Sequence, residues 1–368
     1  MWLFSRTTDL LAFAGTAVLS FALAWSLPSL GVAHDTPPWA WLVFVVFIDV
    51  AHVWSTVWRT YFDKDELTRR PLLYAGAPLF AYALGVAAHA HSSELFWRLL
   101  AYVAVWHFIR QQVGWMVLYG RRSKNVHPLD KAVIYAATLG PVVWWHANLP
   151  LSFWWFKEHD FISGMPRVVG TLALGVHFAV IAAWLAHALV TRTFHPGKAL
   201  LLFATWLAWF GGIVLAKSDL AFTIMNVALH GVPYLVLTHR YARGREADAP
   251  FGGLPTQLLK LGIAGFLLVL WAIAFAEEFL WDRLVWHDHP VFFGGGFSPA
   301  APGAETDGFE LGALALTLVV PLLSLPQTTH YVLDGFIWKA SGDSTLVRRL
   351  GWMGSESTTE INTLRVPP

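Results

Sequence analysis

The sequence predicts an all-α, polytopic integral-membrane helical bundle with about ten transmembrane helices and with the N- and C-termini in the cytoplasm. The chain of 368 residues is 56% hydrophobic and only 13% charged, whereas soluble domains are about 25% charged. It contains ten apolar stretches that are long enough for a bilayer, which requires about 20 residues per helix. Its Lys and Arg residues alternate between rich and poor connections, which is typical of a polytopic membrane protein.

The ten apolar stretches follow one another along almost the whole chain. We place them at residues 9–27, 39–61, 71–88, 95–119, 130–147, 167–191, 198–216, 219–239, 257–276 and 311–338. The first stretch has no suitable cleavage site and is followed by nine others. We therefore expect it to be a retained helix and not a signal peptide.

The positions of Lys and Arg test these stretches independently of hydropathy. Nineteen of the 25 lie at the N-terminus, in every second connection or after the tenth stretch, and only five lie in the other connections. Because cytoplasmic loops carry the positive excess, both termini are expected in the cytoplasm, in a bacterial inner membrane. We expect a transmembrane domain at 1–340, with a long outer loop at 277–310, and a cytoplasmic tail at 341–368.

The composition also excludes several kinds of site. The chain has no Cys, which excludes disulfides, thiolate zinc sites, iron–sulfur clusters and cysteine nucleophiles. A formal net charge of +1 provides no field that would attract nucleic acid. Any metal must be held by nitrogen and oxygen, and 16 His are present.

Four of the apolar stretches each place a His and a second polar residue on one helix face, three or four positions apart. The pairs are Asp49 with His52, His107 with Gln111, Asn226 with His230, and His330 with Asp334. All four helices are expected to run in the same direction, and each His precedes a cytoplasmic Arg or Lys by seven to fourteen residues. At 1.5 Å per residue this is roughly 10 to 20 Å, so the four His can form one layer. Ionisable groups at membrane depth are costly and usually functional.

This layer predicts a metal site with six main ligands. The expected metal-binding residues are His52, His107, His230, His330, Asp49 and Asp334, with His177 of the sixth stretch as a further candidate. The expected catalytic residues are Asp49, Asp334, Gln111 and Asn226. The two amides are expected to orient ligands or substrate, because neutral amides bind transition metals weakly. The ligand count exceeds the needs of one zinc and favours a dinuclear site, with iron as the first choice and zinc as the alternative.

The predicted function is that of a membrane di-metal oxygenase or oxidoreductase that hydroxylates, desaturates or cleaves a lipophilic substrate from the bilayer. Membrane lipid and an electron-donor protein are the expected partners, and nucleic acid is not. Two alternatives use the same residues: a zinc-dependent lipid amide or ester hydrolase with Asp49 or Asp334 as base, and a proton- or metal-coupled transporter with a His/Asp relay. A metal-free polar network and axial ligation of haem also stay open. The chain lacks the H-x-x-x-H and H-x-x-H-H boxes of membrane desaturases and hydroxylases, so no family's residues are transferred to it.

Overall fold

The computed structural model describes residues 1–31, 36–149, 160–216, 218–294, 311–340 and 342–352. Across these ranges the chain forms helices and no strands, which confirms the predicted all-α class. The chain divides into two compact units. The first unit contains Met1–Ala40 and Arg98–Val236, and the second contains Trp41–Trp97 and Leu237–Pro368.

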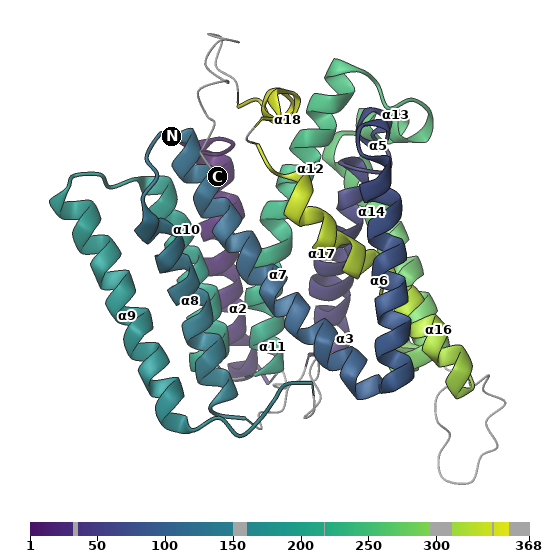
Figure 1. Ribbon diagram of the computed structural model, residues 1–368, viewed down its shortest axis with the longest axis horizontal. Coiled ribbons are helices and arrows are strands. Elements are labelled where there is room, and N and C mark those ends of the chain that lie inside the picture. The colour runs from purple at the N-terminus through teal and green to yellow at the C-terminus, as the bar shows by residue number, and fades with distance from the viewer. Residues whose placement is uncertain (32–35, 150–159, 217, 295–310, 341, 353–368) are drawn as a thin grey trace. The chain divides into compact units, whose positions relative to one another are not determined.

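The first unit is formed by helices (Figure 1). Several of these helices contain π-helical segments, labelled η. Its elements are α1 (Arg6–Asp9), η1 (Leu10–Gly15), α2 (Thr16–Ser29), α3 (Pro38–Ala40), α8 (Pro128–His146), α9 (Arg167–Val190), α10 (Pro196–Trp206), η4 (Leu207–Leu215), α11 (Asp219–Phe222) and η5 (Thr223–Val227). It also holds most of α7 (Ser93–Arg122) and the first part of α12 (Ala228–Asp248). Helix α8 packs against α9, α10 and η4, and α2 packs against η4 and η5.

A glycine allows α8 and α9 to approach closely. A Cβ atom at Gly140 would lie 2.7 Å from the Cβ of His177, so a larger residue would push the two helices apart. Small residues at helix contacts are typical of membrane bundles, where backbones must come close to gain packing energy. Helix α8 starts with a capping box, in which His127 accepts from Leu129 N and Asp130 accepts from His127 N.

The second unit is also formed by α-helices with π-helical and 3₁₀ segments. Its elements are η2 (Trp41–Val50), α4 (Ala51–Ser55), the 3₁₀ turn η3 (Thr56–Trp58), α5 (Lys64–Arg69), α6 (Pro71–His91), α13 (Gly253–Lys260), α14 (Gly262–Trp281), η6 (Asp282–Trp286), α15 (Pro290–Phe293), α16 (Ala313–Leu323), α17 (Leu325–Ile337) and α18 (Ser344–Arg349). Helix α14 packs against η2 and α4, and α6 packs against α16 and α17.

Every predicted apolar stretch coincides with helical structure, and eight of the resulting helices are long and apolar enough to cross a membrane. The eight are Arg6–Ser29, Pro38–Trp58, Pro71–His91, Arg167–Val190, Pro196–Leu215, Asp219–Asp248, Gly262–Trp286 and Ala313–Ile337. Helices α7 and α8 cover the fourth and fifth predicted stretches but are not among the eight. A helical bundle is thus confirmed, while ten spans and their orientation stay predictions.

Part of the predicted outer loop and part of the predicted tail are helical. Helix α14 continues to Trp281, so it includes Glu277 and Glu278, and η6 and α15 follow it. Residues 295–310 and 353–368 lie outside the described ranges. In the tail, Asp343 caps α18 by accepting from Leu346 N at 2.9 Å.

The second unit contains a largely buried arginine–carboxylate network that the sequence analysis did not anticipate. It consists of Arg59, Arg69, Arg245, Arg349, Asp63, Asp65, Glu66 and Asp343. Asp63 is completely buried and lies 3.0 Å from Arg245 Nε and 2.7 Å from Arg349 Nη1. A Cβ atom at Gly244 would lie 2.0 Å from the carbonyl oxygen of Arg349, so glycine is needed there for α18 to approach α12.

The balance of forces on Asp63 favours its charged form. Burial acts to raise the pKa of this carboxyl, but hydrogen bonds from Tyr241 and Arg245 and the charges of Arg349 and Arg245 outweigh it and hold the pKa below the usual value. The Tyr241 hydroxyl donates to Asp63 Oδ2 at 2.6 Å. Three donors therefore converge on one buried carboxylate.

Candidate metal centre

Two of the predicted histidine ligands form a pair in the second unit. His52 lies on α4, immediately after the π-helical η2, and His330 lies on α17. Each is only 1% exposed, and their ring centroids are 4.9 Å apart in an edge-to-face arrangement. Single π-helical turns shift the register of the following residues and are frequent at functional sites.

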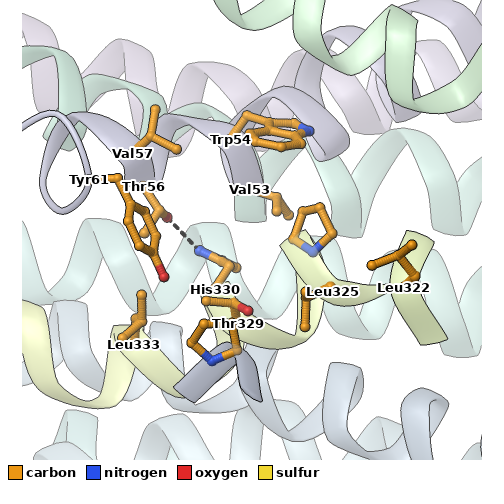
Figure 2. Close-up of a pocket in the computed structure, with 12 residues that line it drawn as sticks. Val53, Trp54, Thr56, Val57, Tyr61, Leu322, Leu325, Thr329, His330 and Leu333 are labelled. Carbon is orange, nitrogen blue, oxygen red and sulfur yellow. Dashed lines mark hydrogen bonds between the residues drawn. The ribbon is translucent and has the colours of Figure 1, made fainter. Parts of the chain in front are cut away.

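A polar side chain lies beside Nδ1 of each ring in this pair. The Thr56 hydroxyl and His330 Nδ1 form a hydrogen bond of 2.7 Å (Figure 2). Asp49 Oδ1 lies 3.3 Å from His52 Nδ1. Because Nδ1 of His330 is hydrogen-bonded to Thr56, Nε2 is the nitrogen that this ring can offer to a metal.

Asp334, the carboxylate of the tenth stretch, lies farther from its neighbouring histidine than Asp49 does. Asp334 Oδ1 is 4.0 Å from His330 Nδ1 and accepts a hydrogen bond from Trp338 Nε1 at 3.0 Å. Asp49 and Asp334 thus both lie beside the Nδ1 side of a histidine. This position suits a residue that orients a ligand, and their predicted role as metal ligands stays a prediction.

The other two predicted ligands form a pair in the first unit. His107 lies on α7 and His230 lies on α12, just after the π-helical η5. They are 6% and 1% exposed, and their ring centroids are 5.0 Å apart. The ring of His230 also stacks on Phe108, with centroids 3.7 Å apart and an interplanar angle of 11°. This stack fixes the plane of the imidazole.

His52, His107, His230 and His330 are four residues that could hold a metal ion, and they are hereafter called the four-histidine group. Each of His52, His107, His230 and His330 offers one ring nitrogen, and these nitrogens all lie within 4.8 Å of one another. All four side chains are buried. The sequence predicted these four residues from their spacing and direction, and the group is compatible with a metal site.

The two predicted amides lie one helical turn from histidines of the group. Gln111 follows His107 by four residues on α7, and Asn226 precedes His230 by four residues. The side-chain amide atoms of both are buried and have no hydrogen-bond partner among the described residues. Such groups are costly unless something pairs with them, which agrees with a role beside a ligand or substrate without testing it.

His177 does not belong to the four-histidine group. It is buried on α9, and its Nδ1 lies 2.8 Å from the carbonyl oxygen of Ala136. Its ring stacks near Phe210 at a centroid distance of 5.7 Å. These contacts are those of a packing histidine, and its predicted metal role stays untested.

Sequence reasoning missed Thr56 and Phe108, which contact His330 and His230 directly. Thr56 follows His52 by four residues and so shares its helix face. A search for hydrogen-bonding residues at that spacing, beyond the usual ligand types, would have found it. Phe108 carries no such signal, because a phenylalanine in an apolar helix is ordinarily a packing residue.

The donor set fits a first-row transition metal. Imidazole suits iron, zinc, copper and nickel, and the described part of the group includes neither thiolate nor carboxylate among its four donors. Geometry alone does not name the metal. No protein family, curated protein or solved structure matches the chain.

Proposed function

We propose that the chain is an integral-membrane oxidoreductase in which the four-histidine group holds iron and oxidises a lipophilic substrate. The observation that carries the proposal is the convergence of four buried histidine nitrogens within 4.8 Å. Nitrogens that surround one ion tetrahedrally at 2.0–2.1 Å lie about 3.4 Å apart. Small side-chain rotations are therefore enough to bring the four donors onto one ion.

A metal explains the group better than a purely structural role does. Neutral imidazoles at close range direct lone pairs into the same small volume, and a cation placed there removes their mutual repulsion. A structural network would instead alternate donors and acceptors, as the arginine–carboxylate network does. Each neutral imidazole carries one N–H donor and one acceptor nitrogen, and four ring nitrogens within 4.8 Å of one another can act as ligands of the same cation.

The number of nitrogen donors favours iron over catalytic zinc. Four histidines fill the tetrahedral shell of zinc, whereas catalytic zinc sites keep three protein ligands and one open position. A six-coordinate iron ion bound by the four histidine nitrogens would keep two coordination positions open for dioxygen or substrate. Iron in such a site supplies one-electron chemistry with dioxygen.

The protein's own contribution is to hold and orient the donors. Thr56 orients the ring of His330 through a hydrogen bond to Nδ1, and Asp49 lies 3.3 Å from Nδ1 of His52, where a carboxylate can orient that ring. Burial of all four rings excludes water from the oxidising centre. A second metal ion, as the sequence predicts, would need the carboxylates of Asp49 and Asp334 in addition.

The substrate and partners follow from the surroundings of the group. Eight helices are long and apolar enough to span a bilayer, so a substrate that reaches buried residues in such a bundle is expected to come from lipid. Oxidation by dioxygen also requires electrons, which an electron-donor protein at the cytoplasmic face would deliver. Hydroxylation, desaturation and chain cleavage are all reactions of this class.

Reaction of the reduced protein with oxygen tests the proposal. Purified protein loaded with ferrous iron is mixed anaerobically with oxygenated buffer, and absorbance is followed in time. The wild type should show an oxygen-dependent change that is lost in His230→Ala and kept in His146→Ala. An oxygen-insensitive wild type that hydrolyses a lipid ester or amide would establish the zinc hydrolase instead, and proton- or metal-coupled uptake into vesicles would establish the transporter.

A further inference from the structure

The second unit contains a pocket with a volume of about 260 Å³ beside His330. Figure 2 shows its lining residues, most of which come from α4 and η3 on one side and from α16 and α17 on the other, with Tyr61 after η3 and Pro78 of α6 completing the lining. Its walls are mainly aliphatic, with Val53, Val57, Leu325 and Leu333 around His330. The pocket therefore offers an apolar surface next to one of the four metal-binding candidates.

Most polar side-chain atoms that line the pocket are already paired within the protein. The Thr56 hydroxyl bonds to His330 Nδ1. Tyr61 OH donates to the carbonyl oxygen of Tyr74 at 3.0 Å, and Trp54 Nε1 donates to Glu277. These groups add polar atoms to the lining but need no ligand.

The hydroxyl of Thr329 differs from them. Its residue is 7% exposed, and its oxygen has no hydrogen-bond partner among the described residues. The neighbouring Thr328, by contrast, donates to the carbonyl oxygen of Ser324 at 3.0 Å in the usual helical manner. A buried hydroxyl that faces a pocket without a partner is costly unless a ligand pairs with it.

We infer that this pocket binds a segment of an apolar chain that carries one hydrogen-bonding oxygen, with that oxygen at Thr329 and the neighbouring carbons beside His330. The aliphatic walls select hydrocarbon, and the single hydroxyl accommodates a single polar group. Ligand cavities are typically about 300–1,000 Å³, so this pocket takes part of a long molecule and leaves the rest outside.

The exposed lining residues show where the rest of a bound molecule would extend out of the pocket. Leu322 is 52% exposed and Tyr61 is 38% exposed, and both belong to the lining. An alkyl or isoprenoid alcohol, ketone or aldehyde has the required chemistry. This inference rests on the proposed function only in that His330 is taken as a metal ligand.

Photolabelling of the full-length purified protein tests the pocket. The probe is a twelve-carbon primary alcohol with a diazirine near the hydroxyl and a terminal alkyne, and labelled peptides are identified by mass spectrometry. We expect saturable labelling of the peptides that contain Val53, Val57, Leu325 and Leu333. Unlabelled dodecanol should compete at least tenfold better than dodecane, because only the alcohol can pair with Thr329.

Two variants and one matched control sharpen the test. Val57→Phe should abolish saturable labelling by filling the pocket. Thr329→Val keeps the shape of the side chain and should reduce the advantage of dodecanol over dodecane at least tenfold. Thr328→Val, one position away and outside the lining, should change neither result.

Each outcome bears on the inference. Labelling spread over many helices, or labelling that survives in Val57→Phe, would overturn the pocket. Equal competition by dodecane and dodecanol would overturn the role of Thr329. Metal content measured on the same preparations separates this inference from the proposed function: metal without pocket labelling contradicts the pocket alone, and pocket labelling without metal contradicts the metal centre alone.

Discussion

The arginine–carboxylate network and the four-histidine group are both buried clusters of ionisable side chains, but their polar atoms are satisfied in different ways. In the network, opposite charges face one another: Arg59 lies 2.8 Å from Glu66, and Asp63 lies within 3.0 Å of both Arg245 and Arg349. In the four-histidine group, one ring nitrogen from each of four imidazoles lies within 4.8 Å of the others. The network can cancel its charges internally, whereas the group gains from an added cation.

This difference distinguishes a self-compensated ion-pair network from a candidate metal site. Buried charges persist where partners and hydrogen bonds compensate their desolvation, and the network meets that condition without any ligand. Four converging lone-pair donors are the arrangement that a metal requires. Loss of a network residue should therefore affect stability, and loss of a histidine should affect metal binding.

The largest expected effect is the difference in thiol labelling between cysteines on the two predicted sides of the membrane. The sequence predicts the network connections at the cytoplasmic face and the segment after α14 at the outer face. The wild type has no Cys, so single cysteines can be introduced without background. Val291→Cys, at a side chain that is 76% exposed, should react with a membrane-impermeant thiol reagent in sealed cells. Val126→Cys and Ala247→Cys should react only after permeabilisation, and labelling of either in sealed cells would contradict the predicted topology.

Asp63→Asn should cause the largest loss of stability. Removing one partner of a buried charge cluster typically costs about 3–5 kcal/mol, and Asp63 faces both Arg245 and Arg349. Thermal unfolding in detergent measures the effect, while metal per folded chain should stay at the wild-type level. Asp65→Asn is the matched control, because Asp65 contacts the same two arginines but is 65% exposed. It should cost no more than about 1 kcal/mol.

The depressed pKa of Asp63 sets the pH range in which this stability is lost. A carboxyl whose pKa is lower in the folded chain stabilises the fold above its unfolded pKa, near 3.8, and that stabilisation disappears as pH falls through the folded value. The Asp63 contribution, measured as the difference in unfolding between wild type and Asp63→Asn, should stay constant between pH 8 and pH 5. A decline within that range would contradict the assignment.

Residues that orient histidines should have intermediate effects on metal binding. Thr56→Val preserves shape but removes the hydrogen bond to His330, and Asp49→Asn weakens the contact with His52. Each should lower metal affinity about 10- to 100-fold, as measured by competition with a chelator. Thr60→Val is the control for Thr56, because Thr60 is also buried but donates only to a backbone carbonyl. If Asp49→Asn removed metal completely, Asp49 would be a ligand, as the sequence predicts.

His177→Phe should have the smallest effect. The ring of His177 packs beside Gly140 and Phe210, and phenylalanine preserves an aromatic ring at this position. Metal content should match the wild type within error. A loss comparable to that of the four histidines would restore His177 as a ligand.

Much of this architecture could be predicted because long apolar helices leave a strong signal in the sequence. Each apolar stretch became a helix, and the His52, His107, His230 and His330 positions emerged from spacing and chain direction alone. Helical spacing does not predict which face of one helix contacts which face of another. The hydrogen bond between Thr56 and His330 and the stacking of Phe108 on His230 were therefore not predictable. The network was missed for a related reason: Arg59 and Asp63 are far from Arg245 and Arg349 in sequence, and loop charges ordinarily face water.

Metal content of the purified protein tests the central claim most directly. Inductively coupled plasma mass spectrometry should find about one or two irons per wild-type chain, and His52→Ala, His107→Ala, His230→Ala and His330→Ala should each lose most of that metal. His146→Ala is the matched control, since His146 is also buried but its two nitrogens contact Val142 O and Tyr102 OH. Full metal retention in all four variants, or a metal-free wild type after loading, would contradict the four-histidine metal centre.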